Sequence, residues 1–132
     1  MTGSVAATIT MAVLRARPQS TTVTFEVTGS TDKEMTISWR VPGSVYGKVT
    51  EKDLTVSRLP WSATVHVPSR EGVLWLDAHV PYLGPPPADA TLNCRIAVDG
   101  HVVDTGQIEQ SLWDVQCRTT LQQVFNPPPA HA

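Results

Sequence analysis

Apolar and polar residues alternate at every second position in several segments between Thr21 and Val124. A period of two is typical of a β-strand with one buried face, because successive side chains point to opposite sides of a sheet. The clearest segments are 23–28, 35–41, 61–67, 73–80 and 92–98, with weaker signals in 44–58, 107–117 and 119–124. No segment has the longer period of an extended amphipathic helix. The pattern therefore predicts an all-β chain.

The composition agrees, because 17 Val and 16 Thr make up a quarter of the 132 residues. These β-branched side chains fit a pleated sheet better than a helix. Turn signals separate the alternating segments, and Asp99-Gly100 is the sharpest, since this pair suits a two-residue hairpin in which both positions need positive φ. We expect a single immunoglobulin-like antiparallel β-sandwich of about seven strands over residues 21–125, with 73–80 as a central strand.

The two ends of the chain differ from this domain. Residues 1–20 hold an apolar run that ends near Arg15 and Arg17, and the run is shorter than the ~20 residues that a membrane-spanning helix needs. Two interpretations stay open: the run is the remnant of a longer membrane anchor, or it is an ordinary first strand or frayed terminus. Residues 126–132 include three consecutive prolines and predict a disordered tail.

Charge and motif content argue against several function classes. The formal net charge is −2 and no cluster of Lys and Arg is present, which argues against a nucleic-acid binder. None of the four histidines is spaced with another ligand in a metal-binding pattern. A G-x-S-x-G nucleophile motif and a glycine-rich phosphate loop are both absent from the sequence. We therefore expect no cofactor, no metal and no enzymatic activity.

Four tryptophans are many for a chain with only 2 Phe and 2 Tyr. Trp39 lies on the expected core face of its strand. Trp61 follows a proline at a strand start and is placed to cap one end of the core, whereas Trp75 and Trp113 are candidates for surface exposure. An exposed aromatic side chain usually marks a partner or an apolar ligand. Trp61, Trp75 and Trp113 are therefore the candidate contact residues.

The two cysteines, Cys94 and Cys117, stand 23 positions apart. An even number of cysteines permits a disulfide. Two buried thiols that pack as small apolar side chains are the alternative. The spacing alone leaves both interpretations open.

Three blocks of sequence resemble a known family. They are VTFEVTG at 23–29, LPWSATV at 59–65 and NCRIAVDGHVV at 93–103, and Cys117 follows them. Together they resemble the mycobacterial membrane protein small family, MmpS, in which the blocks occur in the same order. The most specific block is C-R-I-x-V-D/N-G with a second cysteine about twenty residues later. The resemblance extends over roughly Thr21 to Val124.

The resemblance implies a β-sandwich on the outer side of the cytoplasmic membrane, held there by one N-terminal transmembrane helix. It implies that the domain assists an RND-type exporter, MmpL, in moving lipids, siderophores or some drugs. It also implies a disulfide between Cys94 and Cys117. The apolar run in residues 1–20 would then lie where the membrane helix of the family ends, although the run is too short to span a membrane.

The leading hypothesis is therefore a non-catalytic accessory subunit of an MmpL-type RND transporter on the periplasmic side of the cell envelope. A second hypothesis is a free-standing secreted module that binds an apolar or envelope ligand. A third is a structural component of a larger assembly, joined through its β-sheet edges.

Overall fold

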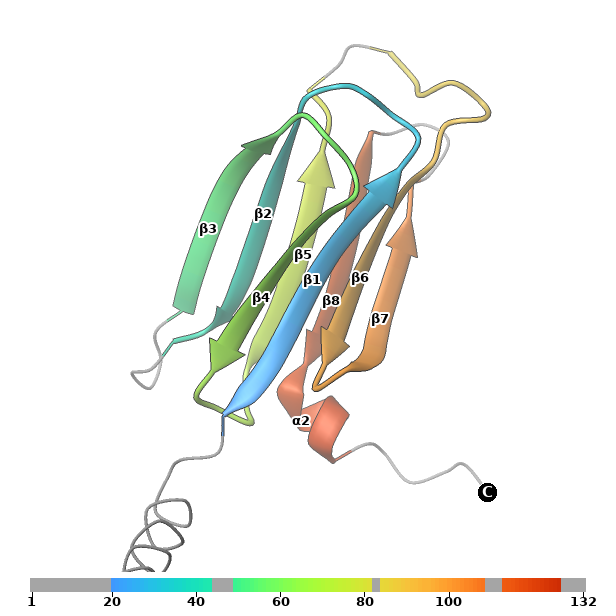
Figure 1. Ribbon diagram of the computed structural model, residues 1–132. Coiled ribbons are helices and arrows are strands. Elements are labelled where there is room, and N and C mark those ends of the chain that lie inside the picture. The colour runs from blue at the N-terminus through green and yellow to red at the C-terminus, as the bar shows by residue number, and fades with distance from the viewer. Residues whose placement is uncertain (1–19, 44–48, 82–83, 109–112, 127–132) are drawn as a thin grey trace, which may run out of the picture.

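The computed structural model describes residues 20–43, 49–81, 84–108 and 113–126. These residues form two antiparallel sheets that pack face to face (Figure 1). The elements are β1 (Thr21–Gly29), β2 (Met35–Pro42), β3 (Val49–Val56), β4 (Trp61–Val67), β5 (Val73–His79), β6 (Leu92–Val98), β7 (His101–Gln107), β8 (Asp114–Thr120) and the short helix α2 (Leu121–Phe125). The predicted all-β sandwich is confirmed, with eight strands instead of about seven.

The strands divide equally between the sheets. Sheet A has the order β4-β1-β6-β7 and sheet B the order β3-β2-β5-β8. Only the β2–β3 and β6–β7 connections join neighbours within one sheet, and every other connection between consecutive strands crosses to the opposite sheet. Strand β5 lies between β2 and β8, so the prediction of a central strand at 73–80 is confirmed.

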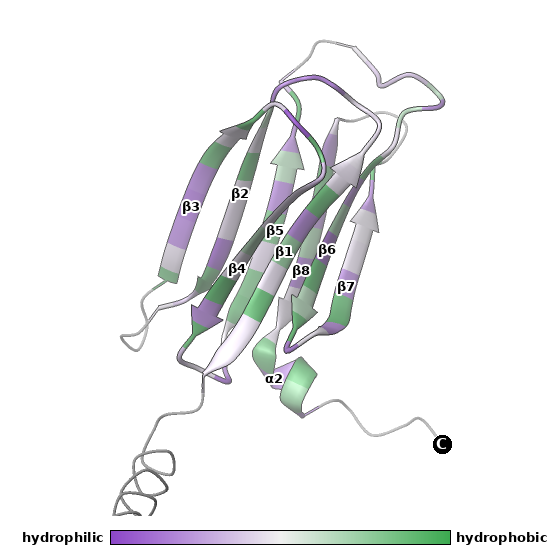
Figure 2. Cartoon of the chain, viewed as in Figure 1, coloured by the Kyte–Doolittle hydropathy of each residue, from purple (hydrophilic) through white to green (hydrophobic). Residues whose placement is uncertain are grey.

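The core lies between the inner faces of the two sheets. Hydropathy alternates along most of the strands (Figure 2), and most of their apolar residues are buried. Phe25 of β1 stacks on Trp39 of β2 across the core, with ring centroids 5.5 Å apart. Trp39 is therefore a core residue, as predicted. Complete burial of a large apolar side chain contributes roughly 1.5–3 kcal/mol, so this inter-sheet contact is a main source of stability.

The β6–β7 hairpin turns at the predicted pair. Asp99 has φ 50° and Gly100 has φ 85°, the positive values that a two-residue turn requires. The Asp99 side chain also ties the hairpin to β1, because its Oδ1 atom accepts a hydrogen bond of 2.9 Å from the Thr22 amide. In return, the Asp99 amide donates to the Thr22 carbonyl at 2.8 Å.

The predicted last strand at 119–124 is wrong over most of its length. The strand β8 ends at Thr120, and residues Leu121–Phe125 form α2. The hydroxyl of Thr120 caps this helix, because Oγ1 accepts a hydrogen bond of 3.2 Å from the amide of Gln123. Helix α2 then covers the end of the sandwich with Leu121, which is fully buried.

Three predictions fall largely outside the described residues. They are the anchor remnant in 1–20, the disordered tail in 126–132, and the segment 109–112. The weak signal in 44–58 corresponds to the single strand β3, whereas 44–48 are not described. In the part of the chain that the structure describes, no helix has the length and hydropathy to cross a membrane.

The two sheets approach each other closely where β7 meets β8. The Oδ2 atom of Asp104 in β7 accepts a hydrogen bond of 2.7 Å from the amide of Arg118 in β8. A Cβ atom placed on Gly106 would lie 2.6 Å from the carbonyl oxygen of Gln116 and 3.0 Å from the Sγ atom of Cys94. The absence of a side chain at position 106 therefore allows this edge of the sandwich to close.

We expect Gly106→Ala to lower the free energy of unfolding by about 1–3 kcal/mol, because the added methyl group meets backbone that cannot move freely. Urea unfolding followed by tryptophan fluorescence measures this change. The neighbouring Thr105→Ala is the control, since its exposed side chain should matter by less than about 0.5 kcal/mol. Equal stability of the two variants would show that the β7–β8 contact is loose.

Candidate functional site

The two cysteines form a disulfide that links the sheets. Cys94 lies on β6 of sheet A and Cys117 on β8 of sheet B, with their Cα atoms 6.0 Å apart. Both residues are buried. The bond that the family resemblance implies is therefore present, and the alternative of two free thiols is wrong. Disulfides of this kind persist in oxidising compartments and are rare in the cytosol.

The expectation of an exposed Trp113 is wrong, because the residue is only 5% exposed. Trp113 precedes β8 and lies two and four positions before Val115 and Cys117, whose side chains point into the core. This spacing of two residues was the sequence signal for its burial. Its carbonyl accepts a hydrogen bond of 2.9 Å from the amide of Val80, which fixes the backbone at this point. Trp113 is a core residue and offers no surface for a partner.

Trp61 is half-buried and packs against the edge of the core from β4. This position agrees with the prediction that Trp61 caps the core. Its ring lies on the inner face of sheet A, in register with the buried Val27 of β1. Only a limited part of the ring is therefore open to a partner.

Trp75 lies on the outer face of sheet B. The guanidinium carbon of Arg40 lies 4.8 Å from the centroid of its ring, a distance at which a cation–π interaction forms. Arg40 in turn pairs with Glu51 of β3 at 3.1 Å. Across the register, Trp75 also stands opposite Arg118 of β8. Trp75 is thus a half-buried ring between two arginines.

Two exposed valines share the outer face of sheet B with Trp75, Val73 on the same strand and Val49 two strands away on β3. Val49 of β3 is 61% exposed and Val73 of β5 is 40% exposed, and they are two of the three large hydrophobic residues that are exposed in the described chain. Pro42 of β2 pairs with Val49 and lies close to Gly72, the residue before Val73. We call Pro42, Val49, Val73 and Trp75 the sheet B patch. Val49 and Val73 were not among the predicted contact residues.

Two carboxylates face each other further along the same sheet face. The pKa of Asp77 is raised from 3.8 to about 7, mainly by burial, and also by a hydrogen bond and charge repulsion from Asp114. Gln116 opposes the shift, because its hydrogen bond to Asp77 lowers the pKa. These interactions leave one oxygen of each aspartate, Oδ1, buried and without a hydrogen-bond partner among the described residues. Near neutral pH, Asp77 is therefore divided between its protonated and charged forms.

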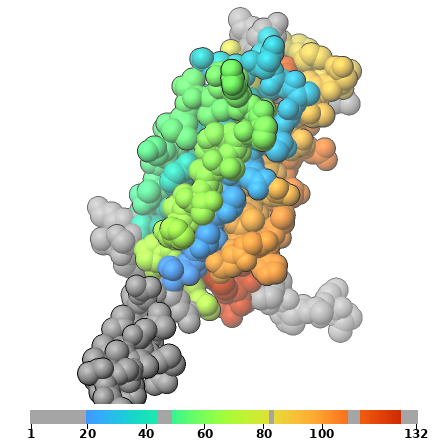
Figure 3. All heavy atoms as spheres, viewed as in Figure 1, coloured from blue at the N-terminus to red at the C-terminus, as the bar shows by residue number. Residues whose placement is uncertain are grey.

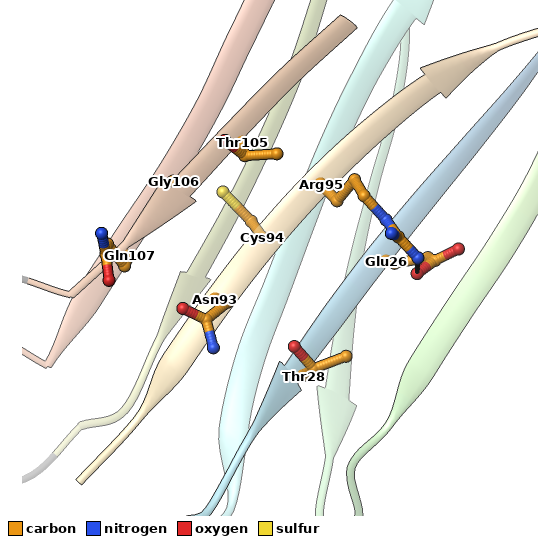
Figure 4. A pocket seen from close by; sticks show the side chains of 8 residues that line it. All are labelled: Glu26, Thr28, Asn93, Cys94, Arg95, Thr105, Gly106 and Gln107. Atoms are coloured by element: carbon orange, nitrogen blue, oxygen red, sulfur yellow. Dashed lines mark hydrogen bonds and ion pairs between the residues drawn. The ribbon is translucent and has the colours of Figure 1, made fainter. Parts of the chain in front are cut away.

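The outer face of sheet A is different, because it carries a polar hollow. Sheet A faces the viewer in the space-filling view, with β1 between β4 and the β6–β7 hairpin (Figure 3). The hollow has a volume of about 410 Å³ and extends across β1, β6 and β7 (Figure 4). Its outward side chains are those of Glu26, Thr28, Asn93, Arg95, Thr105 and Gln107. We call this set the sheet A groove.

Metal-ligating side chains do not come together in the part of the chain that the structure describes. No group of three or more His, Cys, Asp or Glu residues there has an arrangement that could hold a metal ion. Two surfaces are the candidate sites: the sheet B patch and the sheet A groove. The sequence matches no known protein-family model, and no curated protein is significantly similar to it.

We expect Cys94→Ala with Cys117→Ala to lower the free energy of unfolding by about 3 kcal/mol, because the cross-link no longer restricts the unfolded chain. Chemical denaturation of the double variant and of the oxidised protein measures the difference. Wild-type protein unfolded with a thiol reductant present is the control and should match the double variant. A loss of less than about 1 kcal/mol would mean that the core alone holds the sheets together.

We also expect the stability of the protein to fall as the pH rises from about 4 to about 7, relative to that of Asp77→Asn. The folded state keeps the proton of Asp77 up to a pH of about 7, whereas the unfolded chain releases it near 3.8, so the folded state binds more protons in this interval. Because solvent reaches this half-buried pair, the change should be about 1 kcal/mol. Urea unfolding at several pH values measures it.

Asp53→Asn on the exposed edge strand β3 is the matched control for Asp77→Asn. Because Asp53 is exposed, Asp53→Asn should change the free energy of unfolding by less than about 0.5 kcal/mol. A parallel pH dependence for Asp77→Asn and the wild-type protein would show that Asp77 does not titrate in this range.

Proposed function

We propose that this domain is a non-catalytic accessory subunit that docks on an RND-type exporter of lipids or siderophores, of the MmpL kind, at the periplasmic side of the cytoplasmic membrane. The inter-sheet disulfide is the observation that carries the proposal. It joins the two cysteines that the MmpS resemblance pairs, and it suits a domain outside the reducing cytosol.

The sheet B patch is the surface that we assign to the exporter. Interface energy concentrates in a few large side chains such as Trp and Arg, surrounded by smaller contacts. The patch offers Trp75 with Arg40 over its ring, and the exposed Val49 and Val73 on the same outer face. Contact with a partner would remove this apolar area from water.

The position of the patch agrees with docking on a membrane protein. Val73 begins β5, next to Gly72, whose carbonyl accepts a hydrogen bond of 2.8 Å from Leu121 of α2. Thr21, the first residue of β1, donates a side-chain hydrogen bond of 3.1 Å to the carbonyl of Ser69 in the same loop region. The patch thus lies at the end of the sandwich where β1 begins (Figure 1). A membrane anchor that preceded β1 would hold this end nearest to the bilayer.

Affinity purification of the tagged full chain from detergent-solubilised membranes of its own host tests the proposal. We expect mass spectrometry to identify an RND transporter among the co-purified proteins. We expect Trp75→Ala to reduce the recovered transporter about tenfold or more, because loss of a central aromatic anchor costs roughly 2 kcal/mol or more. Urea unfolding of the purified variant shows whether it remains folded.

A milder pair of variants separates docking from folding. Val49→Thr with Val73→Thr keeps the β-branched shape but makes the patch polar, and Val102→Thr on β7 is the matched control, since Val102 is 52% exposed outside the patch. The double variant should reduce recovery of the transporter and the control should not. Recovery of the tagged protein from the soluble fraction alone, with no transporter, would overturn the proposal and favour a free-standing secreted module.

A further inference from the structure

The sheet A groove consists of two cross-strand rows of polar side chains. In one row, Thr28 of β1 stands opposite Asn93 of β6, which stands opposite Gln107 of β7. Glu26, Arg95 and Thr105 form the adjacent row in the same order. The close view shows the two rows on one side of the sheet, with Arg95 and Glu26 reaching toward each other (Figure 4).

Most of the polar side chains in the groove make no hydrogen bond to another group in the described part of the protein. Among the described residues, the side chains of Thr28, Asn93, Thr105 and Gln107 make no hydrogen bond to one another or to neighbouring groups. Arg95 donates to Glu26 through Nη2 only, which leaves further N–H donors of its guanidinium group free. The groove therefore presents a set of donors and acceptors that a ligand could satisfy.

The chemistry of these groups selects the class of ligand. Asn and Gln amides carry a donor and an acceptor side by side, and a Thr hydroxyl can act as either, so the set matches a molecule whose groups also donate and accept. The ion pair between Glu26 and Arg95 brings one charge of each sign, which gives the groove no net charge to attract an ion. The outward side chains of the groove include no aromatic or large aliphatic residue.

We propose that the sheet A groove binds a neutral saccharide, with Asn93 and Gln107 as the residues that hydrogen-bond to its hydroxyl groups. The volume of about 410 Å³ lies at the low end of the roughly 300–1,000 Å³ typical of small-molecule sites, which suits a short stretch of one or two sugar rings. This binding needs no exporter, and it goes beyond the docking function proposed above.

Nuclear magnetic resonance titration of the ¹⁵N-labelled full chain tests this inference. Maltose, cellobiose and N,N′-diacetylchitobiose are the neutral probes, and glucose 6-phosphate is the anionic comparison. We expect at least one neutral disaccharide to shift the amide resonances of β1, β6 and β7 around the groove in a saturable manner. The absence of such shifts with all three disaccharides would overturn the proposal, as would shifts confined to sheet B or binding of the phosphate sugar alone.

A pair of matched variants assigns the effect to the groove. Asn93→Ala with Gln107→Ala removes one cross-strand polar pair from sheet A, and Thr36→Ala with Thr55→Ala removes such a pair from the outer face of sheet B. The first variant should weaken the affinity for the disaccharide about fivefold or more, because two hydrogen-bonding side chains are lost. The second should leave the affinity unchanged. Equal affinities for both variants would overturn the assignment, and amide spectra show that each variant is folded.

Discussion

The packing of the two inner faces against each other is the interaction on which the rest of the structure depends. Each sheet has only four strands and one apolar face, so neither can exclude water from that face alone. Most connections cross from one sheet to the other, so strands that are neighbours in a sheet mostly come from separate parts of the chain. The stack of Phe25 on Trp39 joins the sheets at the core, and the disulfide from β6 to β8 joins them near one edge. Because the two inner faces bury each other, only the outer faces of the sheets are open to a ligand or partner.

The alternation of apolar and polar residues predicts much of this fold, because every second residue of a strand lies on the buried face of its sheet and is therefore apolar. The hairpin at Asp99-Gly100 follows from two residues that accept positive φ. Features set by contacts between distant residues were missed. The helix α2 depends on a cap at Thr120 and on a place for Leu121 at the end of the core, neither of which a period of two can indicate. Trp113 was assigned to the surface although it shares the parity of Cys117, because the start of β8 was not defined by the local pattern.

The candidate binding surfaces were harder to predict, since they depend on strand order and register. Val49 and Val73 look like ordinary strand residues, and only their places on the outer face of sheet B show that they are exposed on the same face as Trp75. The groove brings Thr28, Asn93 and Gln107 into one row from three distant parts of the chain. Trp75 could be assigned to the face opposite the core from its parity alone. Its contact with Arg40 required the pairing of β2 with β5.

The two outer faces differ in chemistry, so the two proposed contacts would use different forces. Sheet B presents two exposed valines on the same face as a tryptophan, and their burial would favour a protein partner. Sheet A presents amide and hydroxyl groups that make no hydrogen bond within the described part of the protein. Covering them costs free energy, because they lose their hydrogen bonds to water, unless the ligand forms hydrogen bonds in their place. The core separates these faces, so a partner on the sheet B patch would leave the groove open to solvent. The groove lies wholly on β1, β6 and β7, and the patch wholly on β2, β3 and β5, so no residue belongs to both. A substitution in one of them therefore removes no side chain from the other, which lets the two proposals be tested separately.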